Sequence, residues 1–162
     1  MESFQAISDQ VRTLQKSGKK VVFTNGCFDL LHPGHIELLR SARALGDVLV
    51  VAINTDDSVR RVKGLNRPVV PEQDRAELLR GLEMVDFVCT FDEDTPLQVI
   101  TTIRPDVLVK GPPWRTDNIV GRAEVESWGG TVKALPAVEG QSTTGIIERV
   151  LARYGNSRKT NK

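Results

Sequence analysis

Two histidines, His32 and His35, lie three residues apart directly after an apolar segment. The pattern predicts a buried β-strand at Lys20–Phe23, a turn at Thr24–Asp29 and an apolar-periodic helix at Gly34–Leu45. The N-terminus of such a helix offers unpaired backbone N–H groups and the positive end of the helix dipole, and the two imidazoles add side-chain donors beside them. This arrangement predicts a site that binds phosphate oxygens.

The histidines allow two other interpretations. With Cys27 as a third ligand they could form part of a metal site, but the chain has only two His and two Cys, and Cys89 falls in a separate predicted strand. A closed zinc site therefore lacks a well-spaced fourth ligand, and we expect no metal held by protein side chains alone. The histidines could also be ordinary capping or core residues, an interpretation that Gly26 and Gly34 beside them in a strand–turn–helix context disfavour.

The run Gly26-x-Phe28-Asp29-x-x-His32-x-Gly34-His35 resembles the signature of the cytidylyltransferase-like nucleotidyltransferases. In that family the His-x-Gly-His motif binds the triphosphate and stabilises the transition state. The fuller match covers about residues 20–150 and resembles the adenylyltransferase domain of ADP-heptose synthesis. Its segments are Thr24–Asp29, Arg67–Val69, Val109–Gly111 and Ser142–Thr144.

The resemblance implies a reaction in which AMP is transferred from ATP to a sugar 1-phosphate, such as D-glycero-D-manno-heptose 1-phosphate, giving an ADP-sugar and pyrophosphate. A sugar 1-phosphate is an anion near neutral pH, so catalysis requires positioning and charge stabilisation more than a general base. Mg²⁺ is expected to arrive with ATP, held mostly by phosphates and water. Two alternatives stay open: a cytidylyltransferase acting on a small phosphorylated alcohol such as glycerol 3-phosphate, and a nucleotide-binding module without turnover.

Basic residues beyond the histidines are expected to complete the site. A loop at Ser58–Val70 carries Lys63 and Arg67 and leads into a helix that carries Arg75. They could be solvated charges, but the resemblance places basic residues from this region at substrate phosphate and lets Arg75 help to position the pocket. Asp29 is expected to orient the turn or a histidine, with magnesium contact as the alternative.

A second helix start, at Ser142–Thr144, supplies hydroxyl groups. Ser142 or Thr143 is a competent N-cap, so capping alone explains much of this pattern. The resemblance adds contact between these hydroxyls and the β- and γ-phosphates.

The segment Lys110-Gly111-Pro112-Pro113-Trp114 departs from the family pattern, in which the heptose enzymes carry Lys-Gly-Gly-Asp-aromatic. Pro113 replaces the aspartate, and both prolines lack a backbone N–H. A carboxylate that could accept from a base amino group is therefore missing. Trp114 either stacks on the base or fills a loop against the core.

The expected site residues fall into three groups. The catalytic group is His32, His35, Lys63 and Lys110. The nucleotide-binding group is Asn25, Gly26, Cys27, Phe28, Gly34, Trp114, Ser142, Thr143 and Thr144. The group that binds substrate phosphate is Lys63, Arg67 and Arg75.

Composition limits the classes of protein to consider. The chain has 162 residues, 40% of them hydrophobic, and a net charge of +1. These values suit one compact domain and give no global reason to expect nucleic acid or an anionic membrane as a partner. Two cysteines at unrelated spacing and the lack of a long apolar segment predict a reducing, cytoplasmic location.

Apolar runs alternate with helical patterns along the chain, which predicts a doubly wound parallel α/β sheet, Rossmann-like, with about five strands in a single domain. Residues 1–19 are expected to form an amphipathic helix that packs on the domain or on a partner subunit, residues 20–154 the nucleotidyltransferase domain, and residues 155–162 a disordered tail. Relatives usually form dimers, so a homodimer is expected. The predicted strands are Val21–Phe23, Val48–Ile53, Phe87–Phe91, Val107–Val109 and Val132–Leu135, and the predicted helices after the first are Gly34–Leu45, Pro71–Met84, Pro96–Ile103, Gly121–Trp128 and Thr143–Tyr154.

Overall fold

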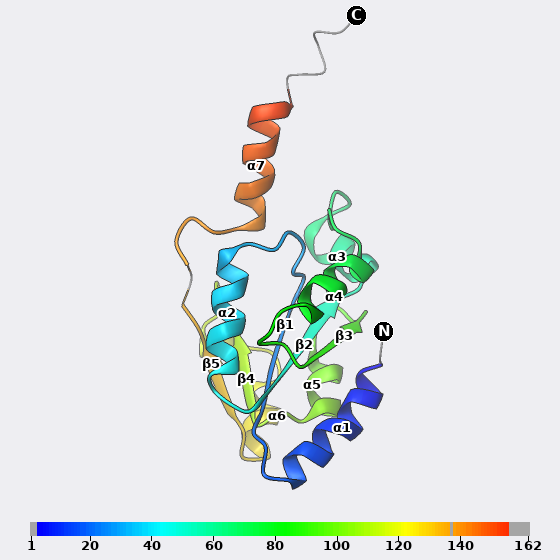
Figure 1. The fold of residues 1–162 in the computed structure, drawn as a ribbon, viewed down its shortest axis with the longest axis vertical. Coiled ribbons are helices and arrows are strands. Elements are labelled where there is room, and N and C mark those ends of the chain that lie inside the picture. The colour runs from blue at the N-terminus through cyan, green and yellow to red at the C-terminus, as the bar shows by residue number, and fades with distance from the viewer. Residues whose placement is uncertain (1–2, 137, 156–162) are drawn as a thin grey trace, which may run out of the picture.

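Helices and strands alternate along nearly the whole chain in the computed structural model, which describes residues 3–136 and 138–155 (Figure 1). In chain order the elements are α1 (Phe4–Lys16), β1 (Val21–Gly26), α2 (Pro33–Arg43), β2 (Val48–Asn54), α3 (Asp56–Lys63), α4 (Glu72–Arg80), β3 (Phe87–Phe91), α5 (Leu97–Ile103), β4 (Val107–Lys110), the 3₁₀ turn η1 (Thr116–Asn118), α6 (Arg122–Ser127), β5 (Thr131–Ala134) and α7 (Thr143–Tyr154).

The five strands form one parallel sheet in the order β3-β2-β1-β4-β5. Its central strands are buried along their whole length, as expected for a sheet covered on both faces. The chain moves outward from β1 through β2 to β3, then returns to the other side of β1 with β4. That reversal is the point at which α/β sheets of this kind bind ligands, beyond the carboxyl ends of the strands. The predicted doubly wound sheet is confirmed.

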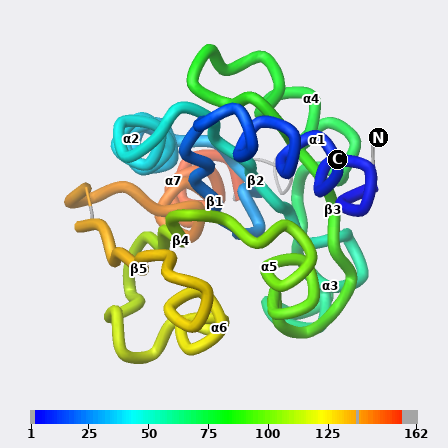
Figure 2. Tube along the Cα trace, turned by 90° about the horizontal axis from the view of Figure 1, so that it is seen from below, coloured from blue at the N-terminus to red at the C-terminus, as the bar shows by residue number. Residues whose placement is uncertain are grey.

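Helices cover the two faces of the sheet in separate layers (Figure 2). On one side, Leu39 of α2 and Leu79 of α4 pack with the apolar residues of the strands. On the other side, Ile7 and Val11 of α1 pack with Ile100 of α5 in a second core. Helix α1 therefore buries its apolar face in its own domain, which is the first of the two partners expected for it.

The first half of the expected loop Ser58–Val70 is helical, so that part of the prediction is wrong. Thr55 caps α3, because its hydroxyl accepts from the N–H of Ser58 at 3.2 Å, and two aspartates in the first turn complement the helix dipole. Val59 anchors the helix in the protein interior. Gly64, with φ of +94°, ends it in a conformation that other residues rarely adopt.

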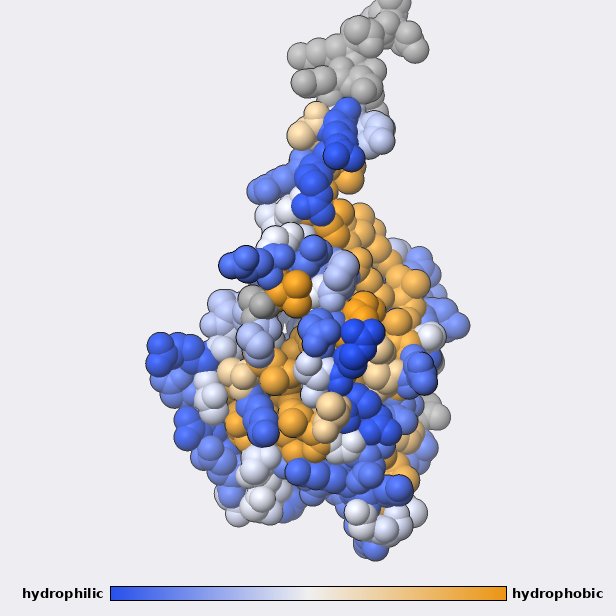
Figure 3. All heavy atoms as spheres, turned by 60° about the vertical axis from the view of Figure 1, so that its left-hand side comes forward, coloured by the Kyte–Doolittle hydropathy of each residue, from blue (hydrophilic) through white to orange (hydrophobic). Residues whose placement is uncertain are grey.

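Helix α7 stands above the body of the domain and places its N-terminus next to α2 (Figure 1). Apolar residues gather at its base, while its far half presents Leu151 and Tyr154 to solvent (Figure 3). Apart from Gly155, the tail expected to be disordered lies outside the described residues. Within the described part of the chain, no helix has the length and apolar character needed to cross a membrane.

Candidate active site

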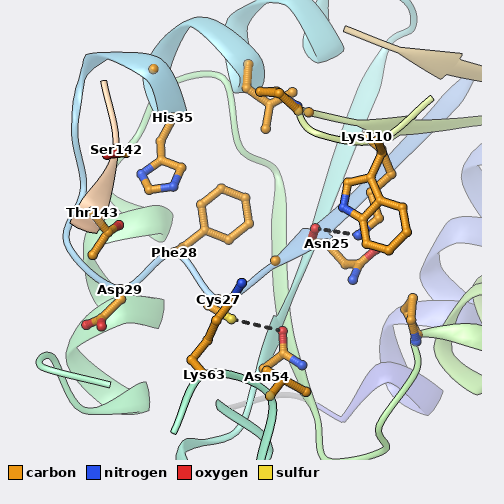
Figure 4. Close-up of a pocket in the computed structure, with 18 of the residues that line it drawn as sticks. Asn25, Cys27, Phe28, Asp29, His35, Asn54, Lys63, Lys110, Ser142 and Thr143 are labelled. Atoms are coloured by element: carbon orange, nitrogen blue, oxygen red, sulfur yellow. Dashed lines mark hydrogen bonds between the residues drawn. The ribbon is translucent and has the colours of Figure 1, made fainter. Parts of the chain in front are cut away.

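A cavity of about 560 Å³ opens at the carboxyl ends of the central strands, beneath the N-terminus of α7 (Figure 4). Its walls bring together the turn after β1, the start of α2, the end of α3, the end of β4 and the start of α7. All the residues expected in the catalytic and nucleotide-binding groups line it. Of the residues expected to bind substrate phosphate, Lys63 and Arg67 line it and Arg75 does not.

The imidazoles of His32 and His35 stack on each other at one end of the cavity. Their ring centroids lie 3.8 Å apart with an interplanar angle of 21°, and the ring of Phe28 lies 5.1 Å from that of His35. The Nδ1 atoms of both histidines are buried and have no hydrogen-bond partner among the residues that the structure describes. Buried polar atoms are normally paired, so the hydrogen bonding of this histidine pair is incomplete in the free protein.

The electrostatics of the two histidines favour their neutral forms in the free protein. Burial, helped by the neighbouring His32, lowers the pKa of His35 to about 4. Burial also lowers the pKa of His32 below its ordinary value. A bound anion would act in the opposite direction, because a nearby negative charge favours the imidazolium.

The start of α2 fixes the geometry of this pair. His32 is the N-cap residue in an extended conformation, and Pro33 occupies the first helical turn, where its missing N–H has no cost. A Cβ atom on Gly34 would lie 3.0 Å from the ring of His32 and 3.1 Å from Cβ of Gln141. Because glycine has no Cβ atom, the ring of His32 and the chain before α7 can both lie close to the backbone of α2 at this position.

Ser142 and Thr143 of the second helix start lie on the same side of the cavity as His35 (Figure 4). The Ser142 hydroxyl accepts from the N–H of Gly145 at 3.0 Å, so its structural role as N-cap of α7 is confirmed. Two helix N-termini, those of α2 and α7, thus meet at one end of the cavity. Both present the positive ends of their dipoles to the same volume.

Asp29 connects the turn after β1 to the segment before α4. Its buried carboxylate accepts hydrogen bonds from Nε of Arg67, from the N–H of Val69 at 2.8 Å and from the N–H of Val70 at 2.8 Å. Burial alone would raise the pKa of Asp29, but these hydrogen bonds and the Arg67 charge hold it below its ordinary value. Asp29 therefore orients a turn, one of the two roles expected for it, and the hydrogen bonds described for its carboxylate go to Arg67, Val69 and Val70.

Arg75 is fully buried, so the expectation that it binds substrate phosphate needs correction. Its guanidinium donates to the carbonyl oxygens of Val70 at 2.9 Å and Cys27 at 2.6 Å, and to a carboxylate oxygen of Asp56 at 2.7 Å. These protein oxygens already occupy its donors. Arg75 supports the turn that carries Cys27 and does not face the cavity, in keeping with the positioning role expected as the alternative.

The edge of the cavity around Lys63, a residue expected to bind substrate phosphate, is open to solvent. Lys63, the last residue of α3, is exposed and lies beside Cys27 at the cavity edge (Figure 4). The Cys27 thiol lies 3.7 Å from Oδ1 of Asn54, and burial raises its pKa although the Lys63 charge acts against this. A neutral thiol and an exposed ammonium suit binding of a phosphorylated substrate rather than covalent catalysis.

Lys110 and Trp114 occupy the other end of the cavity. Lys110 is 8% exposed and donates through Nζ to the main-chain oxygen of Asn25 at 3.1 Å, and burial lowers its pKa to about 8. Its Nζ lies 5.5 Å from the centre of the Trp114 ring, and Trp114 is 43% exposed. Trp114 therefore does not fill the core, which leaves its ring free to stack on a ligand.

Asp94 and Thr95 also line the cavity, although no motif in the sequence singled them out. They follow β3, and their position just after a predicted buried strand was the signal that could have found them. Among residues 3–136 and 138–155, no group of three or more metal-ligating side chains gathers at any point.

Comparisons with known proteins agree with this geometry. A family model described as cytidylyltransferase-like matches residues 23–149. The chain belongs to the cytidylyltransferase-like family. Its His-x-Gly-His residues are the stacked pair at the start of α2, and its membership identifies it as a nucleotidyltransferase.

About half of the residues of this chain that align with its curated relatives are identical in them. The bifunctional protein HldE of Syntrophotalea carbinolica is 52% identical over 150 residues, 93% of this chain and 31% of that protein. The protein of the same name from Geobacter sulfurreducens is 48% identical over 155 residues, 96% of this chain and 32% of that protein. The chain thus spans about a third of the length of these relatives.

Among solved structures, the lipopolysaccharide core biosynthesis protein from Thermoplasma volcanium aligns with a TM-score of 0.63 and 30% sequence identity. The alignment covers 76% of this chain and all of that one.

Proposed function

We propose that this chain transfers the AMP moiety of ATP to a sugar 1-phosphate, giving an ADP-sugar and pyrophosphate. The observation that carries the proposal is the stacked, half-buried histidine pair, placed where the N-termini of α2 and α7 meet, whose two buried Nδ1 atoms have no partner among the described residues. Phosphate oxygens supply the hydrogen-bond acceptors and the negative charge that this end of the cavity lacks.

In the reaction, a phosphate oxygen of the sugar 1-phosphate attacks the α-phosphorus of ATP in line. The bond between the α-phosphorus and the oxygen bridging to the β-phosphorus breaks, and pyrophosphate leaves. The histidines donate hydrogen bonds to α- and β-phosphate oxygens as negative charge grows on the bridging oxygen. The hydroxyls and N–H groups at Ser142–Thr144 bind the β- and γ-phosphates from the other side.

The incoming phosphate is bound by Lys63 and Arg67 at the opposite wall. Lys63 is exposed and free to move toward a ligand, whereas Arg67 is held in place by Asp29 while still lining the cavity. The acceptor we propose is D-glycero-D-manno-heptose 1-phosphate. This choice rests on the resemblance of the chain to the adenylyltransferase domain of ADP-heptose synthesis and on its sequence identity of 52% and 48% with two HldE proteins.

Enzymes of this class generally use a nucleoside triphosphate with a divalent metal, and we propose Mg²⁺ for this one. The protein offers it no cage, because the described residues contain no cluster of ligands and the buried Asp29 carboxylate is fully used by protein donors. Mg²⁺ would therefore come bound to ATP, with water in its remaining positions, and would neutralise part of the triphosphate charge.

A homodimer and a cytoplasmic location also remain part of the proposal. The dimer interface would lie away from the apolar face of α1, which is buried in its own domain. Both cysteines are free thiols, as a reducing compartment requires.

The test is a matrix of nucleoside triphosphates against sugar 1-phosphates and phosphorylated alcohols, scored by pyrophosphate release in the presence of Mg²⁺. We expect the fastest release with ATP and D-glycero-D-manno-heptose 1-phosphate. Release with CTP and glycerol 3-phosphate instead would establish the cytidylyltransferase alternative. Tight binding of ATP without release in any combination would establish a binding module.

A further inference from the structure

Asp94 brings an exposed carboxylate to the wall of a cavity whose proposed ligands are anions. Among the described residues, the carboxylates that line the cavity are those of Asp29 and Asp94. The Asp29 carboxylate is buried and already accepts from protein donors, whereas the Asp94 side chain is exposed. A carboxylate repels phosphate, so we expect Asp94 to contact a different group of the bound substrates.

The topology of the sheet places Asp94 on the side of the cavity away from the proposed triphosphate site. Asp94 follows β3, and the sheet order β3-β2-β1-β4-β5 puts β2 between β3 and β1. Because neighbouring strands lie about 4.8 Å apart, the ends of β3 and β1 are separated by roughly 10 Å. The histidines follow β1, and the Trp114 loop follows β4 on the far side. The part of the cavity that follows β2 and β3 is lined instead by Asn54, Lys63, Asp94 and Thr95.

An ion pair with α3 holds Asp94 on the wall that also carries Lys63. Nε of Arg61 donates to Oδ1 of Asp94 at 3.0 Å, and the same guanidinium donates to the main-chain oxygen of Asp92. Arg61 and Lys63 both belong to the last turn of α3. A carboxylate has about four acceptor positions, so the bond from Arg61 leaves most of them to a ligand.

The chemistry of a carboxylate beside a bound phosphate suits a sugar. An ionised carboxylate only accepts hydrogen bonds, and the neutral donors that a sugar phosphate carries beside its anionic group are hydroxyls. Hydrogen bonds to a charged acceptor are also stronger than those between neutral groups. A magnesium ion is the competing partner, but the Arg61 charge at 3.0 Å from this carboxylate would repel it.

We propose that Asp94 recognises the sugar of the acceptor, accepting a hydrogen bond from one of its hydroxyls while Lys63 binds the phosphate. The inference rests on the proposed function, since it assigns the sugar-binding part of the same site. It makes Asp94 a residue that selects a polyhydroxylated acceptor and has no part in binding ATP.

The experiment measures acceptor binding by NMR titration, with Mg²⁺ and α,β-methylene ATP occupying the nucleotide site. The two acceptors are D-glycero-D-manno-heptose 1-phosphate and methyl phosphate, which has the phosphate without the hydroxyls. The wild-type protein should bind the sugar 1-phosphate more tightly. Asp94→Ala should weaken binding of the sugar 1-phosphate about tenfold, the scale of one hydrogen bond to a charged group, and should not weaken binding of methyl phosphate. Asp94→Asn keeps a neutral acceptor and should lie between the two.

Two control variants make the result specific. Asp92→Ala removes the other carboxylate that pairs with Arg61, at 3.4 Å, from a residue that is not part of the cavity lining, so both acceptors should bind as they do to the wild type. Lys63→Ala should weaken binding of both acceptors, because they share the phosphate.

The inference is overturned if the wild-type protein shows no preference for the sugar 1-phosphate, if Asp94→Ala keeps that preference, or if Asp94→Ala weakens binding of methyl phosphate equally. It is also overturned if the loss appears in binding of α,β-methylene ATP with Mg²⁺, which would place Asp94 in the nucleotide site. Failure of the proposed function has a different signature, since Asp94→Ala would then weaken sugar 1-phosphate binding as expected while the wild-type protein released no pyrophosphate from ATP with that acceptor.

Discussion

Two neighbouring groups of polar residues in this domain differ in how far the protein itself satisfies their hydrogen bonds. Asp29, Arg67 and Arg75 are tied to protein atoms by hydrogen bonds and ion pairs. His32 and His35 line the same cavity as Asp29 and Arg67, with both Nδ1 atoms buried and unpaired. This difference distinguishes residues that support the structure from residues of the site. The hydrogen-bonded group of Asp29, Arg67 and Arg75 fixes the backbone of the cavity, whereas His32 and His35 keep hydrogen-bonding groups that the described residues do not use.

The largest effect on stability should come from breaking the hydrogen-bonded group of Asp29, Arg67 and Arg75. Asp29→Ala removes the acceptor of two backbone N–H groups and leaves the Arg67 charge without its partner. Because breaking a buried pair leaves an uncompensated charge, we expect the free energy of unfolding to fall by about 3 to 5 kcal/mol in urea titrations. The matched control is Asp9→Ala, which removes an exposed ion pair with Arg12 and should cost less than about 0.5 kcal/mol. A loss below about 1 kcal/mol for Asp29→Ala would mean that this group is not a scaffold.

The next effect concerns catalysis with little change in stability. His35→Ala should lower turnover by about two orders of magnitude or more, the scale seen when a donor to the transition state is removed. The free energy of unfolding should change little, since the variant also removes a buried polar atom that has no partner. Arg40→Ala, on the exposed side of the same helix, serves as the control and should turn over normally. Near-normal turnover by His35→Ala would exclude the histidine pair as the catalytic group.

The lowered pKa of His35 should make the free energy of unfolding depend on pH. The pKa of His35 is about 4 in the folded protein, against an ordinary value of 6.5 that applies once the chain unfolds, so the unfolded chain binds more protons between these values. This contribution to stability is present above pH 6.5 and is lost as the pH falls toward 4, by about 2 kcal/mol between pH 7 and pH 4.5. Asp29 has a lowered pKa and also destabilises the fold at acid pH, so the informative quantity is the difference between the wild-type and His35→Gln curves. Superimposable curves would show that His35 is not a buried neutral imidazole.

A smaller effect distinguishes the two serine caps. Ser142→Ala and Ser3→Ala each remove a hydroxyl that accepts from a backbone N–H at a helix start, in α7 and α1 respectively. Each should cost about 1 kcal/mol of stability. Only Ser142→Ala should raise the KM for ATP, by a few-fold, because α7 begins at the cavity and α1 does not. If the two variants have the same KM for ATP, Ser142 caps α7 and has no role in binding ATP.

Much of the fold could be predicted from local patterns. The apolar runs around Val50 and Val109, separated by helical segments, are sufficient to specify a parallel sheet, and the spacing of His32 and His35 after a strand locates one end of the cavity, where we propose that phosphate binds. Helix α3 was missed because its charged residues resemble a loop, although Thr55 followed by two aspartates is an N-terminal helix signal.

The roles of single polar residues depend on contacts that sequence does not reveal. Asp29 binds backbone N–H groups some 40 positions away, and Arg75 bonds to the oxygen of Cys27, 48 positions away. No periodicity or motif spacing reports such pairs. For the same reason, the ion pair between Asp94 and Arg61, 33 positions apart, became visible only in the assembled structure.

The central claim is that the unpartnered histidines bind the phosphates of ATP, and the most direct measurement is an NMR titration of the His35 imidazole with and without ATP and Mg²⁺. In the free protein its pKa should be about 4. With ATP bound, the adjacent phosphate charge should raise that pKa by about one unit or more, and proton uptake should accompany binding below neutral pH. An identical pKa in the free and ATP-bound protein would contradict the account.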